Sequence, residues 1–430
     1  MLMTDIIEKK RDKHPLDDKE LEFFVSGVTD KSIPDYQISA LLMAILLNGM
    51  DRRETLTLTT LMAKSGDMLD LSDLSHTADK HSTGGVGDKT TLAVAPIAAA
   101  LGCTVAKMSG RGLGFTGGTV DKLESITGYK TALDTAEFKK IAREHGMCVT
   151  GQSGNFAPAD KRLYAIRDVT ATVNSIPLIA SSIMSKKLAA GAETIVLDVK
   201  FGSGAFMKTA EDAEILAREM VEIGKGAGRK TAAVITDMDV PLGYAVGNAL
   251  EVKEAVRVLK GEGEKNLTSL CILLAAKMYQ ISFDKTEEES IAAARRVTAD
   301  GIAFKRLCAA VKAQGGNEKL LTGEHKFPAA AQIELTAEKD GYITAMNSET
   351  VGKAAVMTGA GRERLGDGID YSAGIILLKK YGDYVKKGER LATLYGAPER
   401  LQNARERLAD AYSIGESKPP EKPIVYKVID

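Results

Sequence analysis

The first 66 residues carry apolar positions at helical spacing, and no alternating strand pattern interrupts them. Residues 17–20, Asp-Asp-Lys-Glu, form a helix-start signal ahead of an apolar stripe that we expect to stop at Gly27. Pro34 suits the first turn of the next helix, whose apolar positions run from 38 to 47. Residues 1–66 are therefore predicted to form an all-helical unit.

From Asp79 onward, short β-branched runs alternate with longer Ala-rich segments. Such alternation predicts an α/β layer with a mainly parallel sheet, in which ligands bind at the carboxyl ends of the strands. The expected strands are 104–108, 148–150, 194–200 and 231–236.

Two later segments depart from this α/β pattern. Residues 159–191 return to helical periodicity, so their natural place is with the first helical unit. Strand-like runs appear after residue 330, where 382–395 looks like the strand–turn–strand of lipoyl and biotinyl carriers, and 418–423 reads as an extended surface segment. The predicted division is 1–66 and 159–191 for a small helical domain, 67–158 and 192–330 for a large α/β domain, and 331–430 for a C-terminal α+β domain with barrel-sandwich-like strands.

Composition narrows the possible functions. The chain has 430 residues, 44 % hydrophobic and 27 % charged, as in ordinary globular proteins. The net charge is -1, aromatic residues make up 5 % of the chain, and Trp is absent. The chain therefore lacks the basic charge and the stacking aromatic residues that are typical of nucleic-acid binding, so we expect no such partner. The apolar run at 40–47 is too short to span a membrane, and residues 1–11 lack a signal-peptide core. The four cysteines have no Cys-x-x-Cys spacing and are expected as reduced thiols. We expect a cytoplasmic protein with no membrane partner.

Two glycine-rich loops, 80–91 and 107–124, flank one helix-sized apolar segment. The first loop adds Ser, Thr and Lys80 to its glycines, and the second adds Ser, Thr, Lys107 and Arg111. Glycine lets backbone N–H groups approach a ligand, and a loop that leads into a helix N-terminus is an anion site. The spacing matches neither a P-loop nor a dinucleotide fingerprint. The expected anion is phosphate.

The segment 109–124, Ser-Gly-Arg-Gly-Leu-Gly-Phe-Thr-Gly-Gly-Thr-Val-Asp-Lys-Leu-Glu, resembles the signature of the thymidine and pyrimidine-nucleoside phosphorylases. Segments 80–88, 167–187 and 197–200 are similar to the same family, and the resemblance covers nearly the whole chain. It implies a discontinuous helical domain and an active site in the cleft between domains. It also implies phosphate attack at C1′ of uridine, thymidine or deoxyuridine, which gives the free base and (deoxy)ribose 1-phosphate. Orientation and charge stabilisation would carry this reaction without a covalent enzyme intermediate.

The resemblance also implies the site residues. The implied phosphate set is Lys80, His81, Ser82, Thr91, Lys107, Met108, Ser109 and Thr119. The implied base set is Arg167, Ser182 and Lys186, and the expected catalytic groups are His81, Arg167 and Lys186. Ser182 and Lys186 are one i, i+4 step apart and share a helix face, from which cationic donors would stabilise the departing base. His81 is the best candidate for a general acid or a polarising group. Thr91 and Thr119 also suit helix capping.

One monovalent cation, K⁺, and no organic cofactor are implied by the same resemblance. The implied ligands are Gly87, Lys89, Leu242, Ala245 and Glu254, mostly through backbone carbonyls. Lys89 stands where pyrimidine-nucleoside enzymes often have Thr, so a carbonyl ligand survives the change whereas a hydroxyl ligand does not. A homodimer is implied as well, and the helices around 40–47 are its expected interface.

Two more positions bear on specificity and metal binding. Phe115 stands where the family usually has His, so either that His is dispensable or sugar recognition is altered. Lys107 favours the broader pyrimidine-nucleoside enzyme, because an added donor near the sugar can accommodate a ribose 2′-OH. Asp121 and Glu124 are possible Mg²⁺ ligands, although in the family their neighbours suggest arginine pairing.

Three alternatives stay open. A strict thymidine phosphorylase would keep the fold and the mechanism. An anthranilate-type phosphoribosyltransferase shares the architecture but needs Mg²⁺ and a diphosphate substrate, and the set Arg167, Ser182 and Lys186 speaks against it. A carrier module is suggested by the C-terminal segment, which lacks an exposed hairpin lysine for a prosthetic group.

Overall fold

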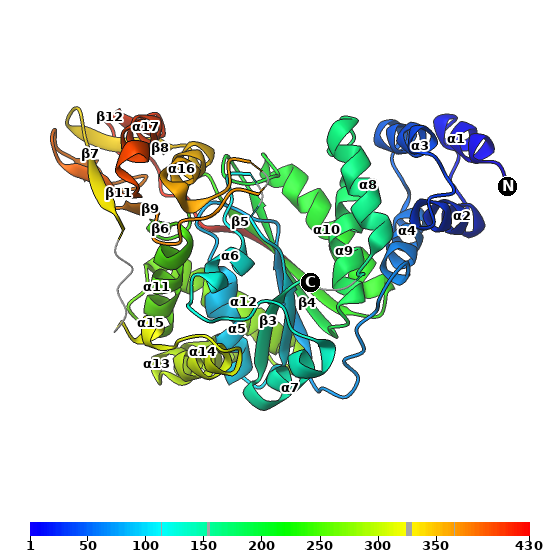
Figure 1. Ribbon diagram of the computed structural model, residues 1–430, viewed down its shortest axis with the longest axis horizontal. Helices are drawn as coiled ribbons and strands as arrows, with labels where there is room; N and C mark the ends of the chain where they lie inside the picture. Colours follow the sequence, from blue (N-terminus) through cyan, green and yellow to red (C-terminus); the bar gives the residue numbers. More distant parts are fainter. Residues whose placement is uncertain (113, 153–154, 324–328, 365) are drawn as a thin grey trace.

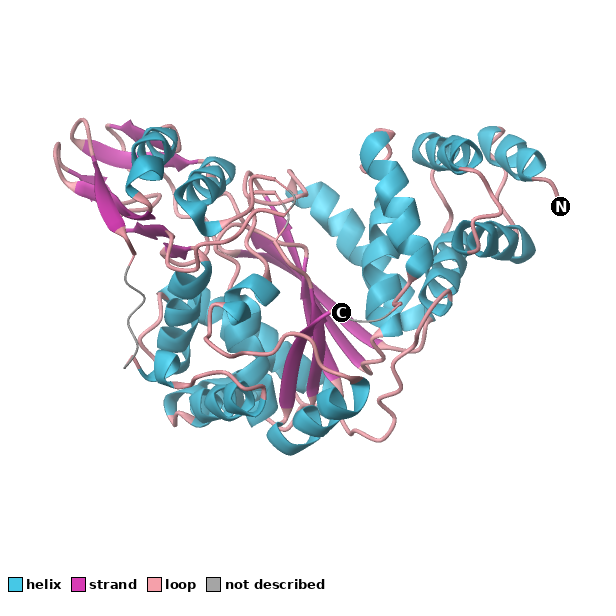
Figure 2. Ribbon diagram, viewed as in Figure 1, coloured by secondary structure: helices cyan, strands magenta, loops and turns pink. Residues whose placement is uncertain are grey.

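The computed structural model describes residues 1–112, 114–152, 155–323, 329–364 and 366–430. A helical unit at one end, a central α/β unit and a strand-rich unit at the other end follow one another along the long axis (Figure 1). Figure 2 shows the strands of the central unit fanned between helical layers. This arrangement confirms the predicted fold class.

The helical unit combines the N-terminal helices with the return segment. Its helices are α1 (Met3–Arg11), α2 (Asp18–Thr29), α3 (Asp35–Asn48), α4 (Arg52–Lys64), α8 (Pro158–Val169) and α9 (Ile176–Ala189). Capping boxes begin α2 and α4, where the Asp17 and Asp51 carboxylates accept backbone N–H groups. Gly27 does not end α2, which continues to Thr29. Helix α8 packs on α2 and α3, and α9 packs on α4, so the return segment joins the first helices as predicted.

The central sheet has the strand order β1–β4–β5–β13, and the parallel pair β2–β3 continues it through a bridge between Thr77 and Thr104. The strands are β1 (Ala78–Ser82), β2 (Val105–Ser109), β3 (Met147–Gly151), β4 (Thr194–Phe201), β5 (Lys230–Asp237) and β13 (Val425–Ile429). Strands β1, β4 and β5 are parallel, whereas β13 pairs antiparallel with β5 at the sheet edge. The sheet is therefore mainly parallel, as expected.

Helices cover both faces of this sheet. The side chain of Val196 on β4 packs into the core with α5, α12 and α14, whereas its neighbours Ile195 and Leu197 pack with α9 and α10. Burial on both faces explains the continuous apolar run of this strand. The helices of this unit are α5 (Thr90–Ala100), α6 (Thr119–Glu124), α7 (Thr135–His145), α10 (Ala210–Gly226), α11 (Asn248–Leu259), α12 (Lys265–Phe283), α13 (Glu287–Ala299), α14 (Ile302–Ala313) and α15 (Lys319–Thr322). Among the described residues, no helix combines the length and apolarity needed to cross a membrane.

The C-terminal unit contains two small sheets, β6–β9–β11–β7 and β10–β8–β12. Its strands are β7 (Ala331–Thr336), β8 (Gly341–Met346), β9 (Gly374–Leu377), β10 (Tyr384–Val385), β11 (Arg390–Gly396) and β12 (Tyr412–Gly415), and its helices are α16 (Ser348–Ala355), the π-helix η1 (Val356–Ala360) and α17 (Pro398–Ala409). Strand β6 (Ala245–Val246) belongs to the α/β segment but pairs with β9. Backbone hydrogen bonds between β6 and β9 therefore connect the α/β unit with the C-terminal unit.

Two strands differ from the sequence prediction. The apolar pattern does not predict β1, because its residues Asp79, Lys80 and His81 are polar. The predicted division places β13 in the C-terminal domain, whereas this strand crosses back and pairs with β5 of the α/β sheet. The segment 418–423 that leads to it lies at the surface without regular structure, as predicted. The last strand thus corrects the assignment of residues 425–429, while the other predicted boundaries stay predictions.

Candidate active site

A cleft between the helical unit and the α/β unit holds a cavity of about 480 Å³. Both units contribute to its lining, and every residue predicted to bind phosphate or base lines it, except Lys80. The predicted residues brought together are His81, Ser82, Thr91, Lys107, Met108, Ser109, Thr119, Arg167, Ser182 and Lys186. The structure therefore gathers residues that lie more than a hundred positions apart in the sequence into one cavity.

The α/β wall of the cleft is built from strand ends and the loops after them. His81 and Ser82 lie at the carboxyl end of β1, and residues 107–109 lie at that of β2. These side chains converge because parallel strands end at one edge of a sheet. Thr91 and Thr119 lie in the first turns of α5 and α6 and occupy neither N-cap position. Both residues line the cavity, and neither caps its helix.

Asp79 lies in this wall and holds two lysines. Lys107 Nζ is 3.0 Å from Asp79 Oδ1, and Lys187 Nζ is 2.7 Å from Asp79 Oδ2, with all three side chains buried. Burial would raise the pKa of Asp79, but the two lysines lower it more strongly. Burial lowers the pKa of Lys107 to about 8. Two cations thus share one carboxylate, and the cluster presents positive charge below about pH 8.

Lys80 takes a different place from the one predicted. Its ammonium lies 3.3 Å from Asp198 Oδ2 on β4 and 2.5 Å from Thr90 Oγ1 on α5, and the side chain is buried. Lys200 Nζ is 2.9 Å from the same oxygen of Asp198. The Lys80 side chain therefore ties β1 to β4 and α5 beneath the first glycine loop. It positions that loop instead of lining the cavity.

The ring of His81 lines the cavity and is half-buried. Burial, together with the charges of Lys187 and Lys107, lowers the pKa of His81 well below its usual value. The ring is therefore neutral at pH 7 and carries one N–H. This favours a polarising donor over a general acid, which would need the imidazolium form.

Arg167 dominates the helical wall. Its guanidinium donates to the carbonyl oxygens of Thr172, Val173 and Leu178 at 3.3, 2.8 and 3.0 Å. It also donates to Ser182 Oγ at 3.1 Å. Burial lowers the pKa of Arg167, yet a guanidinium stays protonated in proteins. The charge is thus fixed in orientation by neutral oxygens, and within the part of the chain that the structure describes no carboxylate is bonded directly to it.

Asp160 on α8 is a site residue that the sequence did not indicate. One of its carboxylate oxygens accepts a hydrogen bond from the Ser182 hydroxyl, and the other accepts from Lys186 Nζ at 2.6 Å. Ser182 and Lys186 therefore share a helix face, as their spacing predicted. No local signal marks Asp160, because these partners lie 22 and 26 residues away.

Apolar side chains line the cavity alongside the polar groups of both walls. These are Tyr164, Val173, Ile179, Ile183, Phe206 and Leu216. Tyr164 also stacks near Arg167, whose guanidinium carbon is 5.7 Å from the ring centroid. A cavity that combines apolar lining with a few oriented donors suits a flat polar ring.

The second glycine loop is ordered by arginines, as predicted for Asp121 and Glu124. Arg111 lies 3.1 Å from Asp121 Oδ1 and 2.6 Å from Glu124 Oε2. Arg362 of the C-terminal unit is 2.9 Å from Asp121 Oδ1, and Gly112 N donates to Asp121 Oδ2 at 2.6 Å. Within the described ranges, no group of three or more His, Cys, Asp or Glu side chains is arranged to hold a metal ion.

Phe115 lies outside the lining of the cavity, where a role in sugar recognition would place it. It is half-buried against the C-terminal core that contains Val86 and Val351, and it is not part of the cavity lining. The Phe side chain thus acts at the junction with the C-terminal unit.

The residues implied as potassium ligands do come together, but around a lysine. Lys89 Nζ donates to the carbonyls of Leu242 and Ala245 at 2.8 and 2.7 Å and to Glu254 Oε2 at 2.6 Å. The carbonyl of Gly87 accepts the backbone N–H of Lys89 at 2.9 Å. The other four implied ligands each accept a hydrogen bond from Lys89, so these residues do not fit a potassium ion.

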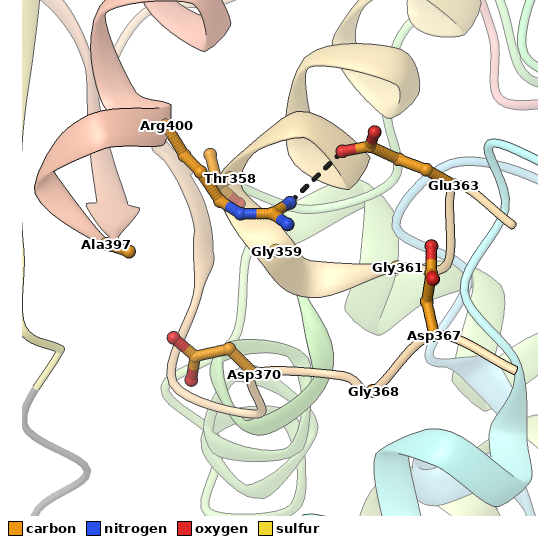
Figure 3. Close-up of a pocket in the computed structure, with 9 residues that line it drawn as sticks. All are labelled: Thr358, Gly359, Gly361, Glu363, Asp367, Gly368, Asp370, Ala397 and Arg400. Carbon is orange, nitrogen blue, oxygen red and sulfur yellow. Dashed lines mark hydrogen bonds and ion pairs between the residues drawn. The ribbon is translucent and has the colours of Figure 1, made fainter.

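A smaller cavity of about 130 Å³ lies in the C-terminal unit between η1 and α17 (Figure 3). Arg400 and Glu363 pair there at 3.1 Å, with Asp367 and Asp370 beside them. None of the predicted site residues lines it. Its volume is below the roughly 300–1,000 Å³ that is typical of ligand pockets. The interdomain cleft is therefore the candidate active site.

The fold and the cleft define an architecture in which a helical bundle faces an α/β domain, and family matches name its class. Residues 4–66 match the model "Glycosyl transferase family, helical bundle domain", and residues 74–304 match "Glycosyl transferase family, a/b domain". Residues 342–415 match "Pyrimidine nucleoside phosphorylase C-terminal domain". This match argues against the alternative that the C-terminal segment is a carrier module.

Curated relatives narrow the class to one family. A pyrimidine-nucleoside phosphorylase of Staphylococcus epidermidis is 50 % identical over 435 residues, and one of Geobacillus stearothermophilus is 50 % identical over 432, each covering 100 % of both chains. One of Staphylococcus aureus is 52 % identical over 419 residues and 97 % of each chain. This chain belongs to the pyrimidine-nucleoside phosphorylase family. The crystal structure of anthranilate phosphoribosyltransferase from Thermus thermophilus has a TM-score of 0.59 at 21 % identity, covering 72 % of this chain and 98 % of that chain, and shows the shared fold.

Proposed function

We propose that this chain catalyses phosphorolysis of pyrimidine nucleosides in the interdomain cleft. The observation that supports it most directly is the pairing of two walls: one collects hydroxyls and the buried Lys107, and the other collects oriented cationic donors. In the reaction, an oxygen of phosphate forms a bond to C1′ of the sugar while the bond from C1′ to N1 of the base breaks. Its electron pair leaves with the base, which takes a proton from water.

Phosphate is assigned to the α/β wall. The hydroxyls of Ser82, Thr91, Ser109 and Thr119 supply donors there, and Thr91 lies in the first turn of α5. Two N–H bonds of Lys107 are directed to Asp79 Oδ1 and the Lys80 carbonyl, at 3.0 and 2.5 Å. An ammonium has three, so one is left for phosphate or a sugar hydroxyl.

The base is assigned to the helical wall. Arg167, Ser182 and Lys186 would donate to the oxygens of the pyrimidine, where negative charge grows as the bond to C1′ breaks. These donors are set in advance by carbonyls and by Asp160, so little reorganisation is needed when the charge develops. A neutral His81 would add a polarising N–H.

The proposed substrates are uridine, thymidine and deoxyuridine. Lys107 is the donor that would accommodate the ribose 2′-OH of uridine. The test follows ultraviolet release of free base from uridine, thymidine and cytidine, with and without phosphate. We expect phosphate-dependent release from uridine and thymidine at comparable rates. Release from thymidine alone would move the assignment to a strict thymidine phosphorylase. Full loss of activity in EDTA would favour the phosphoribosyltransferase alternative.

We also propose a cytoplasmic homodimer. The four cysteines are free thiols, which fits a reducing compartment. Tyr36, Met43 and Leu47 on α3 are exposed, share one face by their spacing, and have exposed Val169 on the adjoining α8. Light scattering coupled to size exclusion tests this, and a monomeric mass at micromolar concentration would contradict it.

A further inference from the structure

The loop that leads from β1 into α5 carries a buried lysine at its end, Lys89, whose side chain crosses to another segment of the α/β unit. Its ammonium makes three short contacts with oxygens of Leu242, Ala245 and Glu254, one for each of its N–H groups. Lys89 is 1 % exposed, so water does not compete for these contacts. We propose that this ammonium is a built-in replacement for the monovalent cation, and that the protein needs no potassium ion.

The oxygens of the cage leave no place for a second cation. Glu254 Oε2 accepts from Lys89 and from Ala245 N at 2.9 Å, while its Oε1 accepts from Tyr244 N at 2.7 Å. The one carboxylate charge is therefore matched by one ammonium. An entering ion would displace that ammonium and leave it buried without partners, which is a costly state.

The tethered cation fixes the geometry of the phosphate wall. It joins three segments: the start of α5, the loop 241–245 and the helix α11. Lys380 of the C-terminal unit holds the same loop from another side, through the carbonyls of Pro241 and Gly243 at 2.8 and 2.9 Å. Lys89 lies two residues before Thr91 in the cavity lining. A side chain that belongs to the loop holds this position at any salt composition, whereas a mobile ion holds it only at sufficient concentration.

The test compares potassium chloride with choline chloride at equal ionic strength and needs no assumption about the reaction. The thermal midpoint of the wild-type protein should differ by less than about 1 °C between the two salts. The Lys89→Thr variant removes the ammonium and supplies a hydroxyl oxygen. Its midpoint should fall in choline chloride and rise by about 3 °C or more when potassium replaces choline.

A matched control is Lys305→Thr, which removes an exposed lysine on α14 and should behave as the wild type in both salts. Crystals of the wild type and of Lys89→Thr grown with rubidium add a second readout, because anomalous scattering should reveal an ion in the variant only. A wild-type midpoint raised several degrees by potassium over choline would overturn the proposal, as would a rubidium peak at the wild-type cage. Should Lys89→Thr fail to fold, the wild-type comparison and the wild-type crystal still decide it.

Discussion

The two walls of the cleft hold their cations in different ways. On the α/β wall, the carboxylate of Asp79 binds both Lys107 and Lys187, which reaches it from α9 of the helical unit, so the cluster keeps an excess of positive charge. On the helical wall, Arg167 is held by carbonyl oxygens and Lys186 is paired with Asp160. The first arrangement suits an anion, whose charge matters more than its orientation. The second suits a flat ring, for which the direction of each donor decides the contact.

Arg167→Ala should have the largest effect, because it removes the fixed donor of the helical wall. We expect kcat/KM for uridine to fall about 100-fold or more, with KM for phosphate changed little. Steady-state kinetics with each substrate varied in turn measures both quantities. Lys161→Ala, an exposed lysine on the same helix, is the control. A decrease of kcat/KM within about threefold would show that Arg167 does not meet the base.

Lys107→Met should weaken the binding of phosphate rather than that of the nucleoside. Removing a buried charge-assisted donor beside phosphate should raise KM for phosphate about tenfold to a hundredfold, with a smaller effect on KM for thymidine. Initial rates over a phosphate series at pH 7 give the value. Equal effects on both Michaelis constants would contradict the division of labour between the walls.

The pH dependence of KM for phosphate tests the same assignment of Lys107 to the phosphate site. Burial lowers the pKa of Lys107 to about 8, so the ammonium loses its proton as pH rises through that value. KM for phosphate should therefore be nearly constant below about pH 7 and rise about fivefold between pH 8 and 9, in inverse proportion to the protonated fraction of Lys107. The slope should be absent in Lys107→Met. A flat profile in the wild type would mean that Lys107 does not contact the anion.

Asp160→Asn should have a moderate effect on the helical wall alone. The amide keeps the shape but loses the negative charge and one of the two oxygens that accept from Ser182 and Lys186. We expect kcat/KM for uridine to fall about fivefold while KM for phosphate stays within about twofold. Because Asp160 acts through its partners, Lys186→Met in the Asp160→Asn background should cost less than it does alone. Additive effects in this double-mutant cycle would refute a positioning role.

Phe115→His should have the smallest effect on catalysis. Phe115 packs on the C-terminal core, so the change should lower the free energy of unfolding by about 1 kcal/mol. The ratio of kcat/KM for uridine to that for thymidine should stay within about twofold. Thermal denaturation and parallel kinetics measure the two outcomes. A shift of this ratio by about tenfold would place position 115 in sugar recognition.

The sequence predicts the elements whose residues are buried for their apolar character, such as β4 with its β-branched run. It misses β1, because Asp79 and Lys80 are buried through ion pairs with residues that come later in the chain. A prediction from apolar positions assigns charged residues to the surface. It therefore does not recognise a strand whose charged residues are buried in ion pairs.

The same limit applies to the candidate site. Loop residues such as Ser82 and Ser109 are found from local composition together with the family resemblance. Asp160 and Lys187 are not predicted from the sequence, since each forms its ion pair with a residue that lies far away in the chain. Lys89 stands out in the sequence as a departure from the family, but its ammonium meets carbonyls 153 and 156 residues away. Only the folded chain shows that these oxygens surround the lysine.

Phosphorolysis requires that phosphate is the group that attacks C1′, and ³¹P NMR of the reaction of uridine with inorganic phosphate tests this most directly. We expect a new pentose 1-phosphate signal that grows in equal amount with the uracil released. Release of uracil with free ribose, while the phosphate signal stays unchanged, would contradict it.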